Sequence, residues 1–286
     1  FNPFFIPKLI GDIAPGHIAI KYGFMGLNYA TVSACASSAN ALADSLNYIR
    51  LGHCDIIVSG GSEAGINITG MAGINAMHAL STRNDSPSTA SRPFDATRDG
   101  FVLGEGSGTL ILEEYEHAKA RGAKIYAELI GAGLSCDAYH ITAPHPEGSG
   151  VKAVIRNCLN DAKIKANEID AINTHGTSTP LGDVAELKAI SNVFGEHAPN
   201  ININSTKSMT GHMLGASGAI EAISVILSIQ NKLVPPTINH KNIDENIDQN
   251  LNLTLNTAQN REINIAMSNT FGFGGHNACV LFKKVD

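Results

Sequence analysis

Short apolar runs alternate along the chain with longer segments in which apolar and polar residues are mixed at helical spacing. The short runs predict strands at residues 30–33, 55–61, 101–113, 124–134, 169–173, 201–204, 263–268 and 277–282. The mixed segments predict helices at residues 14–23, 36–51, 66–80, 115–121, 150–162, 184–193 and 216–231. Strands that alternate with helices are typical of an α/β protein with a mostly parallel, covered sheet.

Two stretches of the chain share one plan, which indicates a duplicated half. Residues 30–113 run as strand, turn, helix, strand and strand, and residues 201–282 repeat that order. Two strand–helix units precede the later copy, whereas only a short segment precedes the earlier one. We therefore expect the first half to lack its opening strands, and the chain to be a C-terminal portion of something longer. The alternative is that the two halves have diverged.

Composition narrows the class of protein. The 286 residues are 43% hydrophobic, enough for a sizeable core, and a net charge of −6 argues against nucleic-acid binding. No apolar run is long enough for a membrane helix, so no membrane insertion is expected. The five cysteines are scattered and form no CxxC pair, which indicates neither a zinc site nor a disulfide framework. A reducing, cytoplasmic location fits this cysteine usage.

Cys35 is a candidate nucleophile because it lies where a short apolar run meets a predicted helix. Helix N-termini carry unpaired N–H groups and partial positive charge. These stabilise a thiolate, so we expect the pKa of Cys35 to fall below the usual value of about 8.5. The alternative is a buried thiol that acts as a small apolar residue.

Three further stretches strengthen the case for a reactive site. His175 follows a predicted strand, His212 follows Lys207 by five residues in a second strand-to-helix turn, and residues 272–275 form a glycine-rich turn. Each has a purely structural alternative. All lie at the carboxyl ends of predicted strands, where ligands bind in open α/β sheets. A charged cluster in residues 83–99 is either paired within a structured loop or a solvated surface.

Several motifs together resemble those of the β-ketoacyl-acyl-carrier-protein synthases, and most nearly the elongating type II enzymes of bacterial fatty-acid synthesis. The motifs are Ser33–Ser37, Ser81–Asp85, Arg98–Gly106, Asn173–Asp183, Ser205–His212 and Asn269–Asn277. The resemblance covers the chain from Phe1 to Lys284 in the order of the family. Members of that family carry additional chain at the N-terminus.

The resemblance implies a thiolase-like fold of two similar βαβαβαββ halves in a layered α/β/α/β/α arrangement, with the first half incomplete here. Residues 1–123 would be the remainder of the N-terminal half, which carries the nucleophile. Residues 124–286 would be the C-terminal half, which carries the two histidines and the lysine.

The resemblance also implies a decarboxylative Claisen condensation at a Cys-His-His site. Cys35 would take an acyl group from an acyl-carrier thioester, and malonyl-carrier protein would then lose CO2 and attack it. His175 and His212 would stabilise the enolate, and the family does not settle how the two divide the work. Lys207 would orient the histidines, with Glu221 as its partner.

Further positions match the family's substrate contacts. Thr177 and Thr179 match hydroxyls that hold the phosphopantetheine arm, and Phe273 matches a gating aromatic whose N–H completes the oxyanion hole with that of Cys35. Phe271 and Gly274 belong to the same substrate-binding loop. Ile74 stands near the acyl pocket, where some relatives carry Phe.

The resemblance implies acyl carrier protein as the partner, a homodimer, and no metal or other cofactor. Three alternatives remain open at this point. One is the condensing component of a polyketide pathway, which shares Cys-His-His. Another is a cysteine hydrolase that uses Cys35 and His175, for which Lys207 and a second histidine would have no use. The last is a fragment that only binds carrier protein or lipid.

Overall fold

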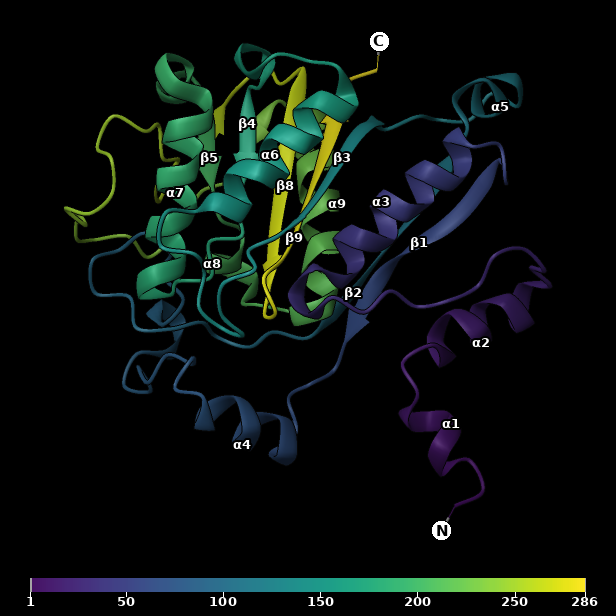
Figure 1. The fold of residues 1–286 in the computed structure, drawn as a ribbon, viewed down its shortest axis with the longest axis horizontal. Coiled ribbons are helices and arrows are strands. Elements are labelled where there is room, and N and C mark those ends of the chain that lie inside the picture. The colour runs from purple at the N-terminus through teal and green to yellow at the C-terminus, as the bar shows by residue number, and fades with distance from the viewer. Residues whose placement is uncertain (1, 286) are drawn as a thin grey trace.

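A five-stranded mixed sheet forms the centre of the computed structural model, which describes residues 2–285 (Figure 1). Its strand order is β3 (Glu128–Cys136), β9 (His276–Lys283), β8 (Ile265–Gly272), β4 (Ala171–Asn173) and β5 (Asn202–Asn204). The β4 strand runs parallel to β5 and β8, whereas β9 runs antiparallel to both of its neighbours. The sheet is therefore parallel where strands alternate with helices along the chain, and antiparallel at its β3 edge.

A second, smaller sheet belongs to the first half of the chain. Its strands β1 (Ile56–Glu63) and β2 (Gly106–Glu113) pair antiparallel, with Ile56 opposite Glu113. Helices α3 (Ser37–Arg50) and α9 (Ser217–Asn231) contact each other and both sheets. On the other face of the large sheet lie α6 (Ser149–Ala162) and α7 (Pro180–Phe194) (Figure 1). The layers are thus helix, sheet, helix, sheet from α6 and α7 to β1 and β2.

The remaining helices and strands are mostly shorter. They are α1 (Phe5–Leu9), α2 (Ile13–Tyr22), α4 (Ile68–Ala76), α5 (Tyr115–Ala120), α8 (Lys207–Thr210), β6 (Leu233–Val234) and β7 (Gln259–Asn260). Helices α1 and α2 lie apart from the main body at the lower right of Figure 1, and neither contains a buried residue. No helix within residues 2–285 combines the length and the apolar character that a membrane span requires.

The starts of α3 and α9 repeat each other in detail. Each helix follows a single 3-10 turn, η1 (Ala34–Ala36) or η5 (Leu214–Ala216), whose first residue has positive φ, 51° at Ala34 and 42° at Leu214. The Ser37 hydroxyl accepts the N–H of the residue four positions earlier, at 3.0 Å, and the Ser217 hydroxyl does the same. The duplication predicted from the sequence therefore extends to hydrogen bonds at both helix starts, with Cys35 equivalent to Gly215.

Small residues allow α3 and α9 to pack closely. A Cβ on Gly218 would lie 2.8 Å from the Ala39 nitrogen and 2.9 Å from its Cβ, so a larger residue would force the helices apart. The Ser38 hydroxyl accepts the N–H of Ala219 at 2.9 Å across the same contact. The two halves therefore meet at the helix whose start carries Cys35.

A buried apolar cluster joins α6 and α7 to the large sheet. Ile155 from α6, Ile172 from β4 and Ile190 from α7 are fully buried within it. Burial of each such side chain stabilises the fold by about 1.5–3 kcal/mol. The short strands β4 and β5 are thus packed firmly within this cluster.

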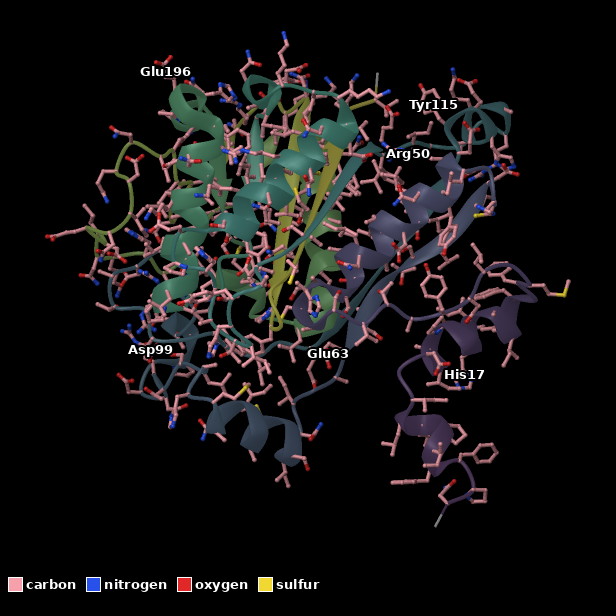
Figure 2. The ribbon with its side chains drawn as sticks, viewed as in Figure 1. His17, Arg50, Glu63, Asp99, Tyr115 and Glu196 are labelled. Atoms are coloured by element: carbon pink, nitrogen blue, oxygen red, sulfur yellow. The ribbon has the colours of Figure 1, made fainter. Side chains whose placement is uncertain are left out.

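At the far end of α3, a second contact ties the first half of the chain to the second. The Arg50 guanidinium donates to Asp161 at 2.8 Å and to the Ile130 carbonyl at 2.7 Å (Figure 2).

The predicted strand at residues 30–33 is wrong. This segment has no strand partner and continues as an irregular chain into η1. Its polar groups turn to the helix start instead, since Thr31 Oγ1 donates to the Ser37 carbonyl at 2.7 Å and the Ser33 N–H donates to the Ser37 hydroxyl. An apolar run becomes a strand only where a neighbour supplies hydrogen bonds, and β1 and β2 supply none to this segment.

Candidate active site

Four segments converge at the carboxyl ends of the central strands. The loop after β4 carries His175, the turn after β5 carries Lys207 and His212, and the end of β8 leads into residues 271–275. The η1 turn brings Cys35 to the same place from the first half. The structure thus gathers the residue types that the sequence singled out at one edge of the sheet.

Cys35 and His212 are in direct contact. His212 Nε2 lies 3.0 Å from Cys35 Sγ, although the two residues are 177 positions apart in the chain. On the other side of the ring, Nδ1 lies 3.0 Å from the Ser217 hydroxyl. The Phe101 ring packs edge-on against His212 with centroids 5.3 Å apart. The imidazole is therefore fixed by contacts at both nitrogens and on its face.

His175 lies beside His212, with ring centroids 5.2 Å apart and planes nearly perpendicular at 86°. Its position is set by the backbone, because the buried Glu186 carboxylate accepts the N–H of His175 at 3.0 Å and that of Gly176 at 2.9 Å. Asn269 Nδ2 donates to the same carboxylate at 3.2 Å. His175 Nδ1 is buried and has no hydrogen-bond partner within residues 2–285.

Lys207 and Glu221 form an ion pair in the interior. Both side chains are almost wholly buried, and Glu221 Oε2 has no hydrogen-bond partner in the described chain. Burial raises the pKa of Glu221 to about 7, against the opposing charge of Lys207. The Glu221 partnership predicted for Lys207 is therefore present as a contact.

Burial sets the protonation of the reactive groups. It raises the pKa of the Cys35 thiol to about 11, and the lysine charge and the backbone N–H groups of Phe273 and Cys35 offset it only in part. The expectation that the helix start lowers this pKa is wrong, because desolvation outweighs the nearby positive charge. Burial and the Lys207 charge also hold the pKa values of His175 and His212 well below their usual range. All three groups are neutral at pH 7.

The glycine-rich loop approaches Cys35 through its backbone. A Cβ on Gly272 would lie 2.6 Å from the Ser33 carbonyl oxygen and 3.0 Å from the Cys35 nitrogen, so only glycine fits there. The Phe273 N–H reaches the Cys35 sulfur, and Phe271 packs against His175 with ring centroids 5.6 Å apart. Gly274, with φ 87°, is exposed at the outer end of the loop. Two N–H groups, those of Cys35 and Phe273, thus face the thiol together.

Thr177 and Thr179 bring two hydroxyls together beside His175. Their Oγ1 atoms lie 3.1 Å apart, and Ser178 between them is fully buried with φ 71°. Ile74, by contrast, lies on α4, a helix without buried residues that projects from the lower edge of the body (Figure 1). Its predicted place near the acyl pocket stays a prediction.

Two residues at the site were missed in the sequence: Ser217, which contacts His212, and Glu186, which holds the His175 backbone. Arg98 belongs to the charged cluster of residues 83–99 and to a family motif, and in the structure it binds the turn after Thr177. Ser217 could have been found from the repeat, since it is the counterpart of Ser37. No local pattern marks Glu186, because its partners are backbone N–H groups and the distant Asn269. Within residues 2–285, no cluster of three or more His, Cys, Asp and Glu side chains is suited to a metal ion.

Two family models match the chain. "Beta-ketoacyl synthase, N-terminal domain" matches residues 1–118, and "Beta-ketoacyl synthase, C-terminal domain" matches residues 126–241.

Characterised relatives are similar over nearly the whole chain. The mitochondrial 3-oxoacyl-[acyl-carrier-protein] synthase of Arabidopsis thaliana is 50% identical over 99% of this chain and 62% of that protein. The 3-oxoacyl-[acyl-carrier-protein] synthase 2 of Synechocystis sp. is 50% identical over 99% of this chain and 68% of that protein. The chain thus spans between three fifths and seven tenths of the length of these relatives.

Solved structures share the fold. A ketosynthase, AntDE, from a type II polyketide system in complex with its acyl-carrier protein has a TM-score of 0.97 and 37% identity, over 100% of this chain and 70% of that chain. A β-ketoacyl synthase from Burkholderia phymatum has a TM-score of 0.91 and 39% identity, over 96% of this chain and 66% of that chain. The chain belongs to the β-ketoacyl synthase family and has its thiolase-like fold.

Proposed function

We propose that the protein catalyses the decarboxylative Claisen condensation that elongates fatty acids in type II synthesis. Acyl-carrier protein, malonyl-carrier protein and one proton would give 3-oxoacyl-carrier protein, CO2 and free carrier protein. The observation that carries the proposal is the 3.0 Å contact between Cys35 Sγ and His212 Nε2, with His175 alongside and two N–H groups at the sulfur. The relatives named 3-oxoacyl-[acyl-carrier-protein] synthase 2 support it.

The first half-reaction is acyl transfer to Cys35. The sulfur attacks the thioester carbonyl carbon, and the N–H groups of Cys35 and Phe273 stabilise the resulting oxyanion. Because the thiol is protonated at pH 7, it needs a base during attack, and His212 Nε2 is within reach. The proton then passes to the departing carrier-protein thiolate. The products are acyl-Cys35 and the free thiol of the carrier.

The second half-reaction uses the two histidines. The malonyl thioester carbonyl accepts hydrogen bonds from His175 and from His212, which for this step carries its single ring proton on Nε2 while Nδ1 accepts the Ser217 hydroxyl. The bond to the malonyl carboxylate breaks, and CO2 leaves with the charge held as an enolate. Neutral imidazoles suit this task, because they donate a hydrogen bond without protonating the carbon nucleophile. The enolate carbon attacks acyl-Cys35, and the Cys35 thiolate that leaves takes up the one proton consumed overall.

Lys207 has an electrostatic role in this scheme. Burial is the main cause of the low pKa values of both histidines, and the Lys207 charge lowers these pKa values further. Glu221 holds the ammonium group in the interior and compensates its charge. The pair thereby positions and tunes the histidines without touching substrate.

Both substrates would arrive on the phosphopantetheine arm of acyl carrier protein. The paired hydroxyls of Thr177 and Thr179 can bind its amides, and Phe271, Phe273 and Gly274 form the loop through which the acyl chain passes. Ile74 contributes to the acyl pocket. A ketosynthase structure at 37% identity contains its acyl-carrier protein, which supports this partnership.

The remaining features of the proposal concern the assembly. We place the protein in the cytoplasm as a homodimer that needs no metal or redox cofactor. The five cysteines are scattered and form no CxxC pair, which favours a reducing compartment.

A polyketide ketosynthase is the second candidate, because the ketosynthase partner of the type II polyketide complex matches the fold at a TM-score of 0.97. The synthases of fatty-acid elongation are nearer in sequence, at 50% identity against 37%. Product length separates the two functions. Elongation with intervening reduction gives one condensation per acyl group, whereas a polyketide synthase adds several units to the same chain.

The test is the intact mass of the protein after incubation with a medium-chain acyl-carrier protein, beside a Cys35→Ser control. We expect an acyl-sized increase that the control lacks, followed by its discharge as a product two carbons longer when malonyl-carrier protein is added. An acylated protein that releases free fatty acid without malonyl-carrier protein would indicate a hydrolase. A protein that gains no mass would overturn the proposal.

A further inference from the structure

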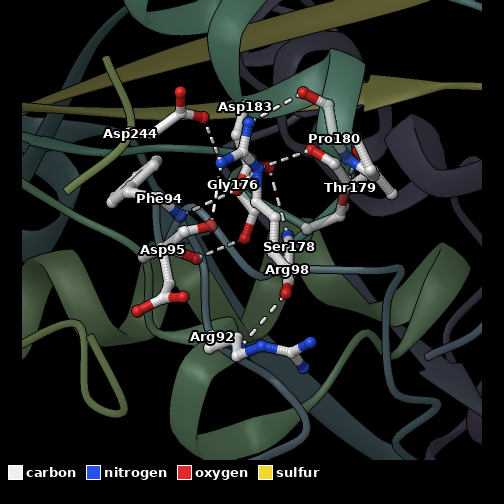
Figure 3. A network of polar contacts seen from close by, with 12 residues as sticks. Arg92, Phe94, Asp95, Arg98, Gly176, Ser178, Thr179, Pro180, Asp183 and Asp244 are labelled. Atoms are coloured by element: carbon white, nitrogen blue, oxygen red, sulfur yellow. Dashed lines mark hydrogen bonds and ion pairs between the residues drawn. The ribbon is translucent and has the colours of Figure 1, made fainter. Parts of the chain in front are cut away.

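The turn that carries Thr177 and Thr179 is held from several sides by a buried polar network (Figure 3). Ser178 is its centre: its N–H donates to Asp183 Oδ1 at 3.1 Å, its carbonyl accepts the Gly100 N–H at 3.0 Å, and its hydroxyl accepts the Arg92 N–H at 3.1 Å. A non-glycine residue at positive φ is strained. The contacts around Ser178 therefore maintain a backbone shape that this residue alone would not keep.

Arg98 makes the most extensive side-chain contact with this turn. Nε donates to the Thr179 carbonyl at 3.0 Å, and Nη2 donates to the Pro180 carbonyl at 2.7 Å. Nη1 binds Asp244 Oδ2 at 2.6 Å and the Asp95 carbonyl at 2.9 Å. The guanidinium is buried, and its fork spans acceptors from three separate segments of the chain.

Asp183 links the Ser178 turn to Phe94 and Arg98 within the network. Its fully buried carboxylate accepts the Phe94 N–H at 2.9 Å through Oδ2, which also lies 3.4 Å from Arg98 Nε. Burial raises the pKa of Asp183 to about 6, and the Arg98 charge opposes that rise. Arg98 thus reaches the turn directly through two carbonyls and also stabilises the carboxylate that holds the Ser178 N–H.

We propose that Arg98 is a positioning residue for the hydroxyls of Thr177 and Thr179, and thereby for substrates carried on a pantetheine arm. The inference rests on the proposed function, in which those hydroxyls bind that arm. Arg98 would not touch the substrate. It fixes the backbone that follows Ser178 through the Thr179 and Pro180 carbonyls and supports the Ser178 N–H through Asp183. This geometry keeps the two Oγ1 atoms 3.1 Å apart.

The kinetic test is Arg98→Lys, because lysine keeps the charge but cannot bind the separate acceptors of the fork. We expect KM for malonyl-carrier protein to rise about tenfold, with kcat changed less than about twofold. The same substitution in a Thr177→Val/Thr179→Val background should change KM less than about twofold, because the hydroxyls it positions are gone. An equal rise in both backgrounds would overturn the inference.

Arg50→Lys is the matched control. Arg50 also binds a carboxylate and a backbone carbonyl, and it lies at the other end of α3 from Cys35. We expect its KM for malonyl-carrier protein to stay at the level of the unsubstituted protein. A rise equal to that of Arg98→Lys would mean that loosening the fold anywhere has this effect, and would also overturn the inference.

A second measurement does not depend on catalysis. Hydrogen exchange of the backbone amides in residues 176–182 should become at least about tenfold faster in Arg98→Lys and stay unchanged in Arg50→Lys. Unchanged exchange in Arg98→Lys would overturn the positioning role even in a protein that condenses acyl groups. Faster exchange in a protein that condenses nothing would support the positioning of the turn and overturn the proposed function alone.

Discussion

Lys207 and Glu221 form a buried ion pair next to the reactive groups of the site. The thiol of Cys35 and the imidazoles of His175 and His212 are neutral at pH 7, because burial raises the first pKa and lowers the other two. Neutral groups at these three positions favour the transfer of an uncharged acyl group. Neutral imidazoles also stabilise an enolate by hydrogen bonds without protonating its carbon. The lysine supplies positive potential without contacting the reacting atoms.

Lys207→Met should move the acid limb of the pH profile of kcat/KM to higher pH. The lysine charge lowers the pKa of each histidine, so its removal lets both pKa values rise and protonates the imidazoles at a higher pH than before. The measurement is condensation rate from pH 5 to pH 9, a range that brackets histidine titration. A limb that stays in place, or moves to lower pH, would contradict this.

Two controls accompany that experiment. Removal of one partner of a buried ion pair lowers the free energy of unfolding by about 3–5 kcal/mol. The double variant Lys207→Met/Glu221→Gln leaves no unpaired charge, so it separates the loss of stability from the change in the histidine pKa values. We expect the double variant to keep the shifted limb with a higher melting temperature than Lys207→Met. Lys188→Met, which breaks an exposed pair with Glu147, should leave the profile unchanged.

Ser217→Ala should lower kcat about tenfold, the equivalent of about one hydrogen bond. Its hydroxyl is the partner of His212 Nδ1 and also accepts the Met213 N–H, so alanine frees the ring to rotate away from Cys35. Ser45→Ala removes a hydroxyl that binds the backbone within α3 and serves as the control. The rate of Cys35 acylation, followed by intact mass, checks the result. Equal acylation rates for Ser217→Ala and Ser45→Ala would contradict the role of Ser217 in holding His212.

At the scale of elements, the reactive side chains stand on strand ends that the core holds rigid. Strands β4, β5 and β8 are adjacent and parallel, so the residues that follow them meet at one edge. Cys35 joins them from the other half of the chain, because the C-terminal end of β8, at Gly272, packs against the η1 turn. The contact between the halves is therefore part of the site itself.

Gly272→Ala should slow acylation of Cys35 about a hundredfold, because a shift of about 1 Å in a reacting group has that effect. Its Cβ would clash with the Ser33 carbonyl and the Cys35 nitrogen, and neither backbone atom can move without moving the thiol. Gly16→Ala, where a Cβ meets no atom within 4 Å, is the control. Intact mass over time and thermal melting give the readout. Normal acylation with a lowered melting temperature would make Gly272 structural only.

The sequence predicted which segments meet at the edge of the sheet and most of the strands, but it was wrong about the strand at residues 30–33. The carboxyl-end rule placed His175, Lys207 and His212 together. A family motif contains Thr177, and Glu221 was expected on the following helix as the partner of Lys207. The strand at residues 30–33 failed because pairing depends on a neighbour that local pattern does not reveal. The predicted direction of the Cys35 pKa shift was wrong for a related reason. The helix start is visible in the sequence, whereas the burial that outweighs its effect on the pKa depends on tertiary packing. The 3.0 Å contact of Cys35 with His212 is likewise a product of the tertiary fold.

At the scale of the whole molecule, exposed apolar side chains gather in the first third of the chain. Met25 and Ile20 are 97% and 81% exposed, and Ile68 on α4 is 91% exposed. Single exposed apolar residues are ordinary, but many close together mark an interaction surface. We propose that α2 and the segment that follows it lie in the interface of the proposed homodimer, because a stable protein interface has an apolar centre.

Sedimentation velocity on the protein tests this arrangement, with a dimer mass expected at micromolar concentration. Ile20→Glu/Met25→Glu places two charges in the exposed apolar segment, and burying unpaired charge in an interface is strongly unfavourable. We therefore expect this variant to sediment as a monomer. Glu196→Gln, a change on the opposite side of the molecule (Figure 2), should leave the dimer intact. A double variant that stays dimeric would assign the apolar segment to contacts within one chain and place the dimer contact elsewhere.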